Sequence, residues 1–339
     1  MAAMACCRAP AWPCKAAGPH HDRTARHPAG RRAAFADAAG PLRRAEGVRR
    51  PEAARPRSRR GAAREDYRCG SLTTDAHGGT DFRVVDEAAF VTGVPVVAAA
   101  AGTVVRRRDG EPDVSVRTRA FAAGRDAGNG VVIDHGDGWV TQYSHLRAGS
   151  ITVEPGERVA AGQAIGMVGL SGNTEYPHLH FDVRHADRPI DPFDARPLTA
   201  ACARSRGQTG LWTRGLAAVL DRATTAIIGG GFATGFVDPA HPRAAEAATS
   251  LATTRPLLLW SEVSGGRRGD ILRFAITGPQ GAIFDAQRPL DGDHLLWMNF
   301  GGKKPPPRGW PPGLVRGEIT LWRDGTLIGD RTVTARIDP

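Results

Sequence analysis

The chain has 339 residues, 41% of them hydrophobic, and no apolar run of about 18 residues, so no membrane-spanning helix is expected. Its formal net charge of +10 arises in the first 70 residues, which hold 16 of the 45 basic and 6 of the 35 acidic side chains and leave 29 of each for the remainder. Because this basic segment has few aromatic side chains for base stacking, we expect no nucleic-acid binding.

Residues 1–66 are dominated by alanine and arginine and are broken by prolines. Residues 1–68 contain 19 alanines and 15 arginines without helical or strand periodicity. Such a composition buries too little apolar surface to offset the entropy of ordering, so a disordered head is predicted. The head also lacks the apolar stretch of about 7 to 15 residues found in secretory signals, so no signal peptide is visible.

The cysteines form no Cys-x-x-Cys pair, which argues against a thiolate zinc site and a redox motif. Their spacing leaves a disulfide between Cys69 and Cys202 open. The five cysteines are Cys6, Cys7, Cys14, Cys69 and Cys202.

Residues 67–198 have the pattern of a compact domain of short strands separated by glycines. Gly78 and Gly79 disfavour a helix, so His77 and Asp81 should converge through a turn that leads into a strand starting at Phe82. After an acidic loop, two short strands are expected at residues 94–98 and 102–106.

A long polar, glycine-rich loop over residues 107–129 follows, and loops of this length either line a binding cleft or are disordered. Residues 131–145 then predict a hairpin with a Gly-Asp-Gly turn. Alternation on its second strand places four side chains on one side, with the last at the strand end: Trp139, Thr141, Tyr143 and His145. His135, beside the turn, is interpreted as a turn residue.

Two further strands at residues 153–159 and 162–169 precede residues 177–184, a strand with one polar and one apolar face. Its apolar face, with Leu179, Phe181 and Val183, should be core. Its polar face, which should form a site, carries His178, His180, Asp182 and Arg184.

The remaining chain is expected to carry no chemistry. Residues 199–254 are interpreted as a linker with one helix around 216–226, and residues 255–339 as a small immunoglobulin-like β-sandwich with a hairpin at Asp324-Gly325. Strands are expected in that sandwich at residues 256–263, 270–277, 295–300, 317–322 and 332–337. His241 and His294 have no partners in the pattern, and the fold class is mostly β.

Three side chains together form the ligand type of a catalytic zinc site, namely His77, Asp81 and His180. A His₂-carboxylate set leaves the fourth position for water, and one carboxylate leaves a net charge of about +1 that acidifies this water. His145 and His178 are then spare imidazoles that could take a proton from the water, give one to a leaving amine or stabilise an oxyanion.

This pattern resembles the lysostaphin and LytM type zinc metallo-endopeptidases, which cut peptide cross-links in peptidoglycan. The resemblance covers about residues 69–192 and rests on His77-Gly-Gly-Thr-Asp81, Tyr143-Ser-His145-Leu146 and His178-Leu-His180-Phe181, together with residues 156–169 and Pro177. It implies a compact antiparallel sheet domain holding one zinc ion per chain, with His77, Asp81 and His180 as ligands. His145 and His178 would be the catalytic pair, with the general base undecided between them.

The resemblance also implies work in the periplasm, outside the cell or at the cell envelope, with peptidoglycan peptides as partner. The segments 81–94 and 107–129 are longer than a minimal domain of this type, which leaves the groove shape and the cleaved bond open. A non-hydrolytic peptidoglycan-binding or hydrolase-activating module on the same scaffold is the alternative. Such modules usually lack a ligand, and all five site residues are present here.

Two other classes fit the sequence less well. A metallo-β-lactamase-like hydrolase would carry His-x-His-x-Asp-His, but Val183 stands where the last histidine is required. A lipoyl or biotinyl carrier domain, suggested by residues 156–169, needs an acceptor lysine, and the only lysines are Lys15, Lys303 and Lys304.

Overall fold

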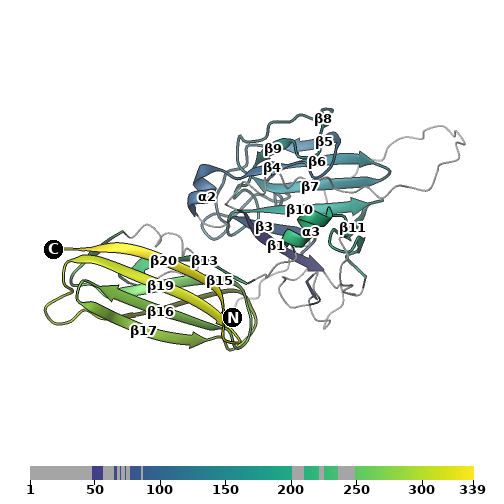
Figure 1. Cartoon of the computed structure of the whole chain (residues 1–339). Coiled ribbons are helices and arrows are strands. Elements are labelled where there is room, and N and C mark those ends of the chain that lie inside the picture. The colour runs from purple at the N-terminus through teal and green to yellow at the C-terminus, as the bar shows by residue number, and fades with distance from the viewer. Residues whose placement is uncertain are drawn as a thin grey trace, which may run out of the picture.

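The computed structural model describes residues 48–55, 65–66, 69, 73, 77–84, 87–200, 210–220, 225–235 and 249–339. Over these residues the chain is mostly β, as expected, and Figure 1 shows its strands in two bodies joined by the connector around residues 200–225. In this described part, helices long and apolar enough to cross a bilayer are absent.

The first body is built on a ten-stranded antiparallel sheet. The strand that carries His178 and His180 lies near its centre. The strands follow one another as β2 (Glu65–Asp66), β1 (Val48–Arg55), β3 (Thr80–Val84), β10 (His178–His185), β7 (Trp139–Leu146), β6 (Asn129–Gly136), β5 (Gly102–Arg108) and β8 (Arg158–Val159). Off this path, β11 (Arg188–Asp191) pairs with β10 and β12 (Arg196–Pro197). A second, two-stranded sheet joins β4 (Pro95–Val97) to β9 (Ala164–Met167).

One face of the large sheet is buried in the core, and the alternation of side chains along each strand determines which residues lie on that face. On β10, Phe181 and Val183 are buried among the core residues, and Leu179 packs against them. Val96 of β4 and Ile165 of β9 belong to the same core, so the small sheet covers this face. The opposite face of β10 therefore carries the polar side chains, as the sequence predicts.

The structure departs from two local expectations in the first half of the chain. Strand β1 lies within residues 1–66, where disorder was expected, and that expectation is wrong there: Pro51, Glu52 and Ala53 pair with β3. The helix α2 (Glu87–Thr92) replaces the expected acidic loop. Residues 1–47 lie outside the described part of the chain, so the expectation of disorder there stays a prediction.

The connector expected as a linker packs against the first body. Its helix α3 (Arg214–Leu220) overlaps the predicted helix, and Leu211, Leu216 and Leu220 lie in the same core as β10. The ring of Trp212 lies 6.2 Å from that of Phe82 on β3 and 5.8 Å from that of Phe181 on β10. It therefore supports, from behind, the two strands that carry Asp81 and His180.

The second body consists of two sheets that share one core, as a sandwich requires. The three-stranded sheet contains β13 (Ala226–Ala233), β15 (Leu257–Gly266) and β18 (His294–Lys303). The five-stranded sheet contains β14 (Ser250–Ala252), β20 (Thr326–Asp338), β19 (Gly313–Arg323), β16 (Ile271–Gly278) and β17 (Gly281–Pro289). Leu259 of the first sheet and Ile319 of the second are both fully buried in that core.

This arrangement corrects the expected boundary at residue 255, since β13 lies in the presumed linker and pairs with β15. The expected hairpin is confirmed: Asp324 and Gly325 have φ of 49° and 75° between β19 and β20. Positive φ at both central residues is the geometry of a type I′ turn.

Replacing Trp212 with Ala should destabilise the first body by about 3 to 5 kcal/mol, because it empties a buried aromatic site behind β3 and β10. Urea unfolding followed by circular dichroism measures this. The matched control is Trp139→Ala, which removes a half-buried indole stacked on His185 and should cost clearly less. Equal losses in the two variants would show that the connector does not stabilise this body.

Candidate metal and catalytic site

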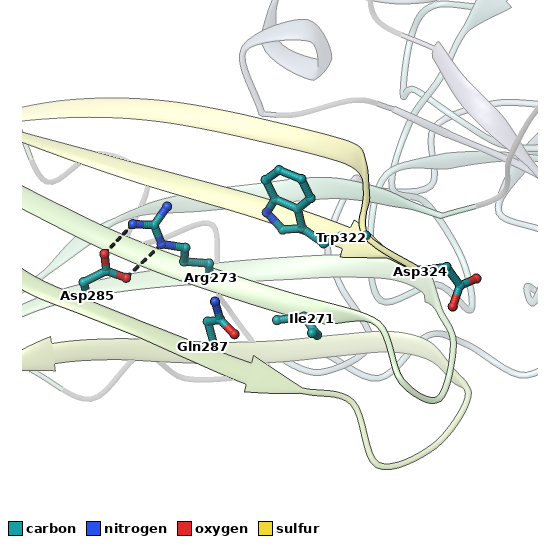
Figure 2. A pocket seen from close by; sticks show the side chains of 7 residues that line it. Ile271, Arg273, Asp285, Gln287, Trp322 and Asp324 are labelled. Atoms are coloured by element: carbon teal, nitrogen blue, oxygen red, sulfur yellow. Dashed lines mark hydrogen bonds and ion pairs between the residues drawn. The ribbon is translucent and has the colours of Figure 1, made fainter.

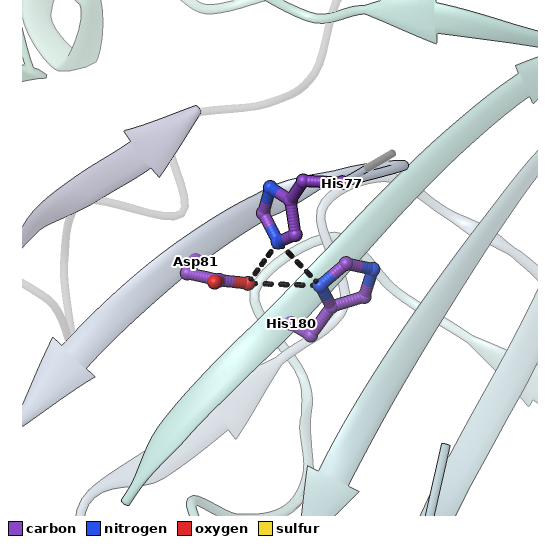
Figure 3. Close-up of side chains that lie close together, drawn as sticks. All are labelled: His77, Asp81 and His180. Atoms are coloured by element: carbon purple, nitrogen blue, oxygen red, sulfur yellow. Dashed lines mark hydrogen bonds and ion pairs between the residues drawn. The ribbon is translucent and has the colours of Figure 1, made fainter. Parts of the chain in front are cut away.

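The three predicted metal ligands lie together where β3 and β10 run side by side. Asp81 and His180 are direct partners in the antiparallel register, and His77 lies three residues before the start of β3. His77 Nε2 lies 2.9 Å from Asp81 Oδ1 and 3.1 Å from His180 Nδ1, and the last two atoms are 2.8 Å apart. Figure 3 shows the three ligand atoms pointing at one another.

This donor set fits a tetrahedral metal ion. Donors at bond lengths near 2.0 to 2.1 Å from a tetrahedral zinc lie about 3.3 Å apart. The observed separations of 2.8 to 3.1 Å thus need only a small outward movement of the side chains. Two imidazoles and one carboxylate occupy three positions and leave a fourth free for water or substrate.

The charges around these atoms favour a cation. Burial opposes ionisation of Asp81, yet His77 and His178 hold the pKa of its carboxyl well below its ordinary value. Burial also disfavours a charged His180, but Asp182 and then Asp81 raise the pKa of His180 to about 10. Carboxylates that favour a proton on this imidazole favour a metal cation in the same place.

Close approach of the two strands depends on Gly79. A Cβ at this position would lie 2.5 Å from the carbonyl oxygen of Phe181 and 2.8 Å from His180 Nε2. Only glycine lets the chain between His77 and Asp81 pass this close to β10. Gly79, the second residue of the Gly-Gly pair that predicted a turn, therefore also permits the close approach of the two strands.

His145 reaches the site by a route that strand alternation does not predict. Tyr143 pairs with Phe181 on the core face, and Ser144 pairs with His180 on the site face, so alternation would turn His145 toward the core. The φ of His145 is 61°, a left-handed conformation that is uncommon for a residue other than glycine. Its ring lies 4.8 Å from that of His178 and 5.9 Å from that of His180.

The expectation that Tyr143 and His145 share a side is thus wrong, although His145 does reach the site. The left-handed residue at the strand end rotates its side chain to the opposite face. Such conformations are costly and often mark functional sites.

Hydrogen bonds fix the tautomers of His145 and His178. A backbone carbonyl only accepts, so His145 Nδ1 donates to Ser171 O at 2.8 Å, and His178 Nδ1 donates to Tyr176 O at 2.9 Å. Nε2 of each neutral ring is then left without a proton. His178 Nε2 lies 3.5 Å from Asp81 Oδ1, so its free lone pair is beside the metal ligands.

Burial keeps both rings in their neutral form. It lowers the pKa of His178 to about 4. Burial, followed by the neighbouring His178 and His180, lowers the pKa of His145 well below its usual value. Both side chains therefore present an unprotonated nitrogen at neutral pH without carrying a charge that would repel a metal ion.

Asp182 is a functional candidate to which the sequence reading gave no role. Its carboxylate Oδ2 lies 3.5 Å from His180 Nε2, on the side of the ring opposite Nδ1. A carboxylate behind an imidazole ligand orients the ring and increases its basicity. Alternation along β10 placed Asp182 on the polar face, and that signal could have identified it as a partner of His180.

The long loop after β5 lies along one edge of the site. Val116 N donates to Thr174 O at 3.0 Å, and Asp113 Oδ1 accepts from Leu170 N at 2.7 Å. Gly128 and Gly172 are in backbone contact, where a Cβ on either would lie 2.3 Å from the other segment. The sequence left open whether this loop lines a cleft or is disordered. In the structure it is ordered and packs against the segment that leads into His178.

Tyr176 connects that segment to β3. Its ring centroid lies 4.8 Å from that of His178, and the Arg83 guanidinium lies 3.5 Å from the Tyr176 centroid. This contact fixes the residue whose carbonyl orients His178.

His135 and His294 have structural contacts away from the site. His135 contacts Thr141 Oγ1 and the Ala101 carbonyl, as a turn-adjacent residue would. His294 contacts Asp291. His241 lies outside the residues that the structure describes.

Comparison with known proteins finds similarity in the part of the chain that carries these site residues. Residues 75–192 match the profile of Peptidase family M23. The peptidoglycan DD-endopeptidase ShyA of Vibrio cholerae is 36% identical over 119 residues, which cover 35% of this chain and 23% of ShyA. The cell division protein DipM of Caulobacter vibrioides is 37% identical over 101 residues, 27% of this chain and 16% of DipM.

A solved zinc-containing peptidase from Vibrio cholerae is 32% identical, with a TM-score of 0.26, and the match covers 37% of this chain and 30% of that one. The chain therefore matches less than a third of the length of these relatives.

Gly79→Ala should destabilise the first body by about 1 to 3 kcal/mol and separate β3 from β10, because the added Cβ overlaps the Phe181 carbonyl. Urea unfolding and metal content of the purified protein report the two effects. Gly78→Ala is the matched control, since its Cβ would meet only Asp182 Oδ1 at 3.8 Å. Unchanged stability and metal content in Gly79→Ala would contradict the close approach.

Proposed function

We propose that residues 75–192, which match Peptidase family M23, form a zinc-dependent endopeptidase domain that hydrolyses peptide cross-links of bacterial peptidoglycan. One observation carries the proposal. Three candidate metal-ligand side chains and two neutral imidazoles, which come from three separate segments of the chain, converge on one space. The relatives named peptidoglycan DD-endopeptidases, ShyA and ShyB, support the substrate class.

Zinc is the metal that this donor set suits best, with one ion per chain. His77, Asp81 and His180 would hold it, and zinc would supply a Lewis acid that activates water and polarises a peptide carbonyl. The single carboxylate among the ligands keeps the site net positive, which strengthens that effect.

His145 and His178 have the protonation state that proton transfer requires. Each presents an unprotonated Nε2, and each has its Nδ1 held by a backbone carbonyl. One of them takes the proton of the attacking water, and the resulting imidazolium gives a proton to the amine leaving group as the C–N bond breaks. The other would take up a proton from solvent as the oxyanion of the tetrahedral intermediate develops, because that negative charge opposes the effect of burial, and would donate this proton to the oxyanion.

Asp182 and the segment 171–176 act on the ligands and bases rather than on the substrate. Asp182 orients His180, while the carbonyls of Ser171 and Tyr176 set the tautomers of His145 and His178. The loop 109–128 packs along this segment, so it would border the groove that receives the peptide.

The place of action proposed is the periplasm or the cell exterior, where peptidoglycan lies. The disulfide of Cys69 supports it, because disulfides persist mainly in oxidising compartments. Its partner lies outside the described residues, and Cys202 is the partner that the sequence reading left open.

The C-terminal sandwich is proposed to be immunoglobulin-like and to begin near residue 225. Its two sheets sharing one core support this assignment. Nothing among its described residues adds a ligand to the metal site.

The wild-type protein should contain close to one zinc per chain, and Asp81→Ala should contain almost none. The variant loses one ligand and the negative charge that compensates the ion. Elemental analysis after dialysis measures the content. Asp285→Ala, which removes an exposed carboxylate from the other body, is the control and should keep its zinc. Full occupancy in Asp81→Ala would remove Asp81 from the ligand set.

His145→Ala and His178→Ala should each retain zinc and lose about 10² to 10⁴ in the rate of cross-link cleavage. Because both act on one transition state, the double variant should lose less than the product of the two single losses. Muropeptides released from purified sacculi, identified by mass spectrometry, report both activity and the bond cut.

Two results would count against these assignments. Loss of zinc in His178→Ala would make His178 a metal ligand. Binding of sacculi by the zinc-loaded wild-type protein without any released muropeptide would favour the non-hydrolytic module.

A further inference from the structure

The second body carries a depression on the outer face of its five-stranded sheet. Its volume is about 410 Å³, within the range of small-molecule sites. The lining residues come from β16, β17, the end of β19 and the turn that follows it, and all but the last are labelled in Figure 2: Ile271, Arg273, Asp285, Gln287, Trp322, Asp324 and Gly325.

Alternation explains why these side chains point away from the core. Leu272 on β16 and Leu321 on β19 are fully buried, so their neighbours Ile271, Arg273 and Trp322 face outward. Ile271 pairs directly with Trp322, and Arg273 pairs with Gln287. The lining is therefore fixed by the sheet register rather than by a loop.

Trp322 is a half-buried indole on the outer face of this sheet. Its Nε1 donates to Thr320 Oγ1 at 2.9 Å, which holds the ring in one orientation. With Ile271 beside it, the indole forms an apolar wall in the depression. A large aromatic ring that is held in one orientation and lines a depression is a ready contact surface for a ligand, since little entropy is lost when it binds.

Planar polar groups face this wall. The Arg273 guanidinium forms a forked pair with Asp285, in which Nε donates to Oδ1 at 2.8 Å and Nη2 to Oδ2. The pair holds the donors of Arg273 and the remaining lone pairs of Asp285 in fixed directions. Gln287 adds an amide that both donates and accepts.

We propose that this depression binds the glycan strand of peptidoglycan, as a site for one or two N-acetylated sugar rings. A pyranose has an apolar C–H face and a rim of hydroxyl and acetamido groups. The C–H face would lie on Trp322 and Ile271, and the rim would exchange hydrogen bonds with Arg273, Asp285 and Gln287. The glycan identity rests on the proposed function, whereas the sugar chemistry rests on the depression alone.

The charge of the lining favours a neutral glycan over charged polymers. The lining holds one arginine and two aspartates, and the arginine is paired. Asp324 leaves the depression slightly negative, which disfavours polyanions and the carboxylate-bearing stem peptides. A neutral, ring-shaped polyol meets no such penalty.

Isothermal titration of the full chain with peptide-free glycan strands, prepared from sacculi with an amidase, tests the proposal. An endopeptidase cannot cut these strands, so the wild-type protein is used. Trp322→Ala should weaken binding about tenfold or more. Gln287→Ala, an exposed edge-strand variant that leaves the fold intact, should weaken it about threefold or more.

Glu318→Ala is the matched control, because Glu318 lies on the same outer face, pairs with Arg316 and does not line the depression. It should bind like the wild type. Equal affinities of Trp322→Ala, Gln287→Ala and Glu318→Ala would overturn the proposal, as would the absence of wild-type binding to the strands. If the wild-type protein bound glycan-free stem peptides and Trp322→Ala did not, the occupant of the depression would be a stem peptide rather than a glycan.

Cleavage assays separate this inference from the proposed function. Trp322→Ala should cleave a soluble cross-linked stem-peptide dimer that carries no sugar at the wild-type rate, while its KM for sacculi rises. If the dimer is not cleaved by any variant, the proposed function fails and the titration still decides the glycan site. If the dimer is cleaved and the strands do not bind, only the glycan site fails.

Discussion

The pairing of β3 with β10 is the constraint on which the rest of the site depends. It sets Asp81 opposite His180, and Gly79 permits the close approach that brings His77 to the same point. Behind the pair, Trp212 contacts the rings of Phe82 and Phe181, so the apolar face of each strand is held while the polar face carries ligands. A metal site of this kind needs donors fixed by rigid strands, since small displacements change affinity strongly.

The four histidines of the site differ in what holds them, and this difference divides their roles. The two predicted bases donate from Nδ1 to backbone carbonyls, which leaves Nε2 available, and burial keeps each ring neutral. His180 instead has a carboxylate beside each ring nitrogen, Asp81 at Nδ1 and Asp182 at Nε2, and these favour a bound cation. We propose that each histidine serves as base or as metal ligand according to its hydrogen-bond partner.

The connector shows how composition can hide structure. Residues 199–254 are rich in alanine, threonine and glycine and lack clear periodicity, yet α3 and Trp212 complete the first core and β13 belongs to the second body. The glycines of β13 have a packing role, since a Cβ on Gly230 would lie 2.7 Å from Ile319 Cδ1 of the facing sheet. Because glycine has no side chain and is unfavourable within strands, these residues hide the strand in the sequence. β17 was missed as well, since this edge strand has little buried surface to impose alternation.

The sequence by itself determined the polar and apolar faces of β10, the hairpin before it, the turn at Asp324-Gly325 and the set of residues that could form a metal site. These features follow from period-two patterns and local turn chemistry, which depend on neighbouring residues only. Tertiary structure decided the rest. His145 faces the site through a left-handed backbone, Asp182 lies behind His180, the connector packs into the core, and β1 pairs with β3. Each depends on contacts between residues far apart in the chain, whose register and backbone conformation no local pattern encodes.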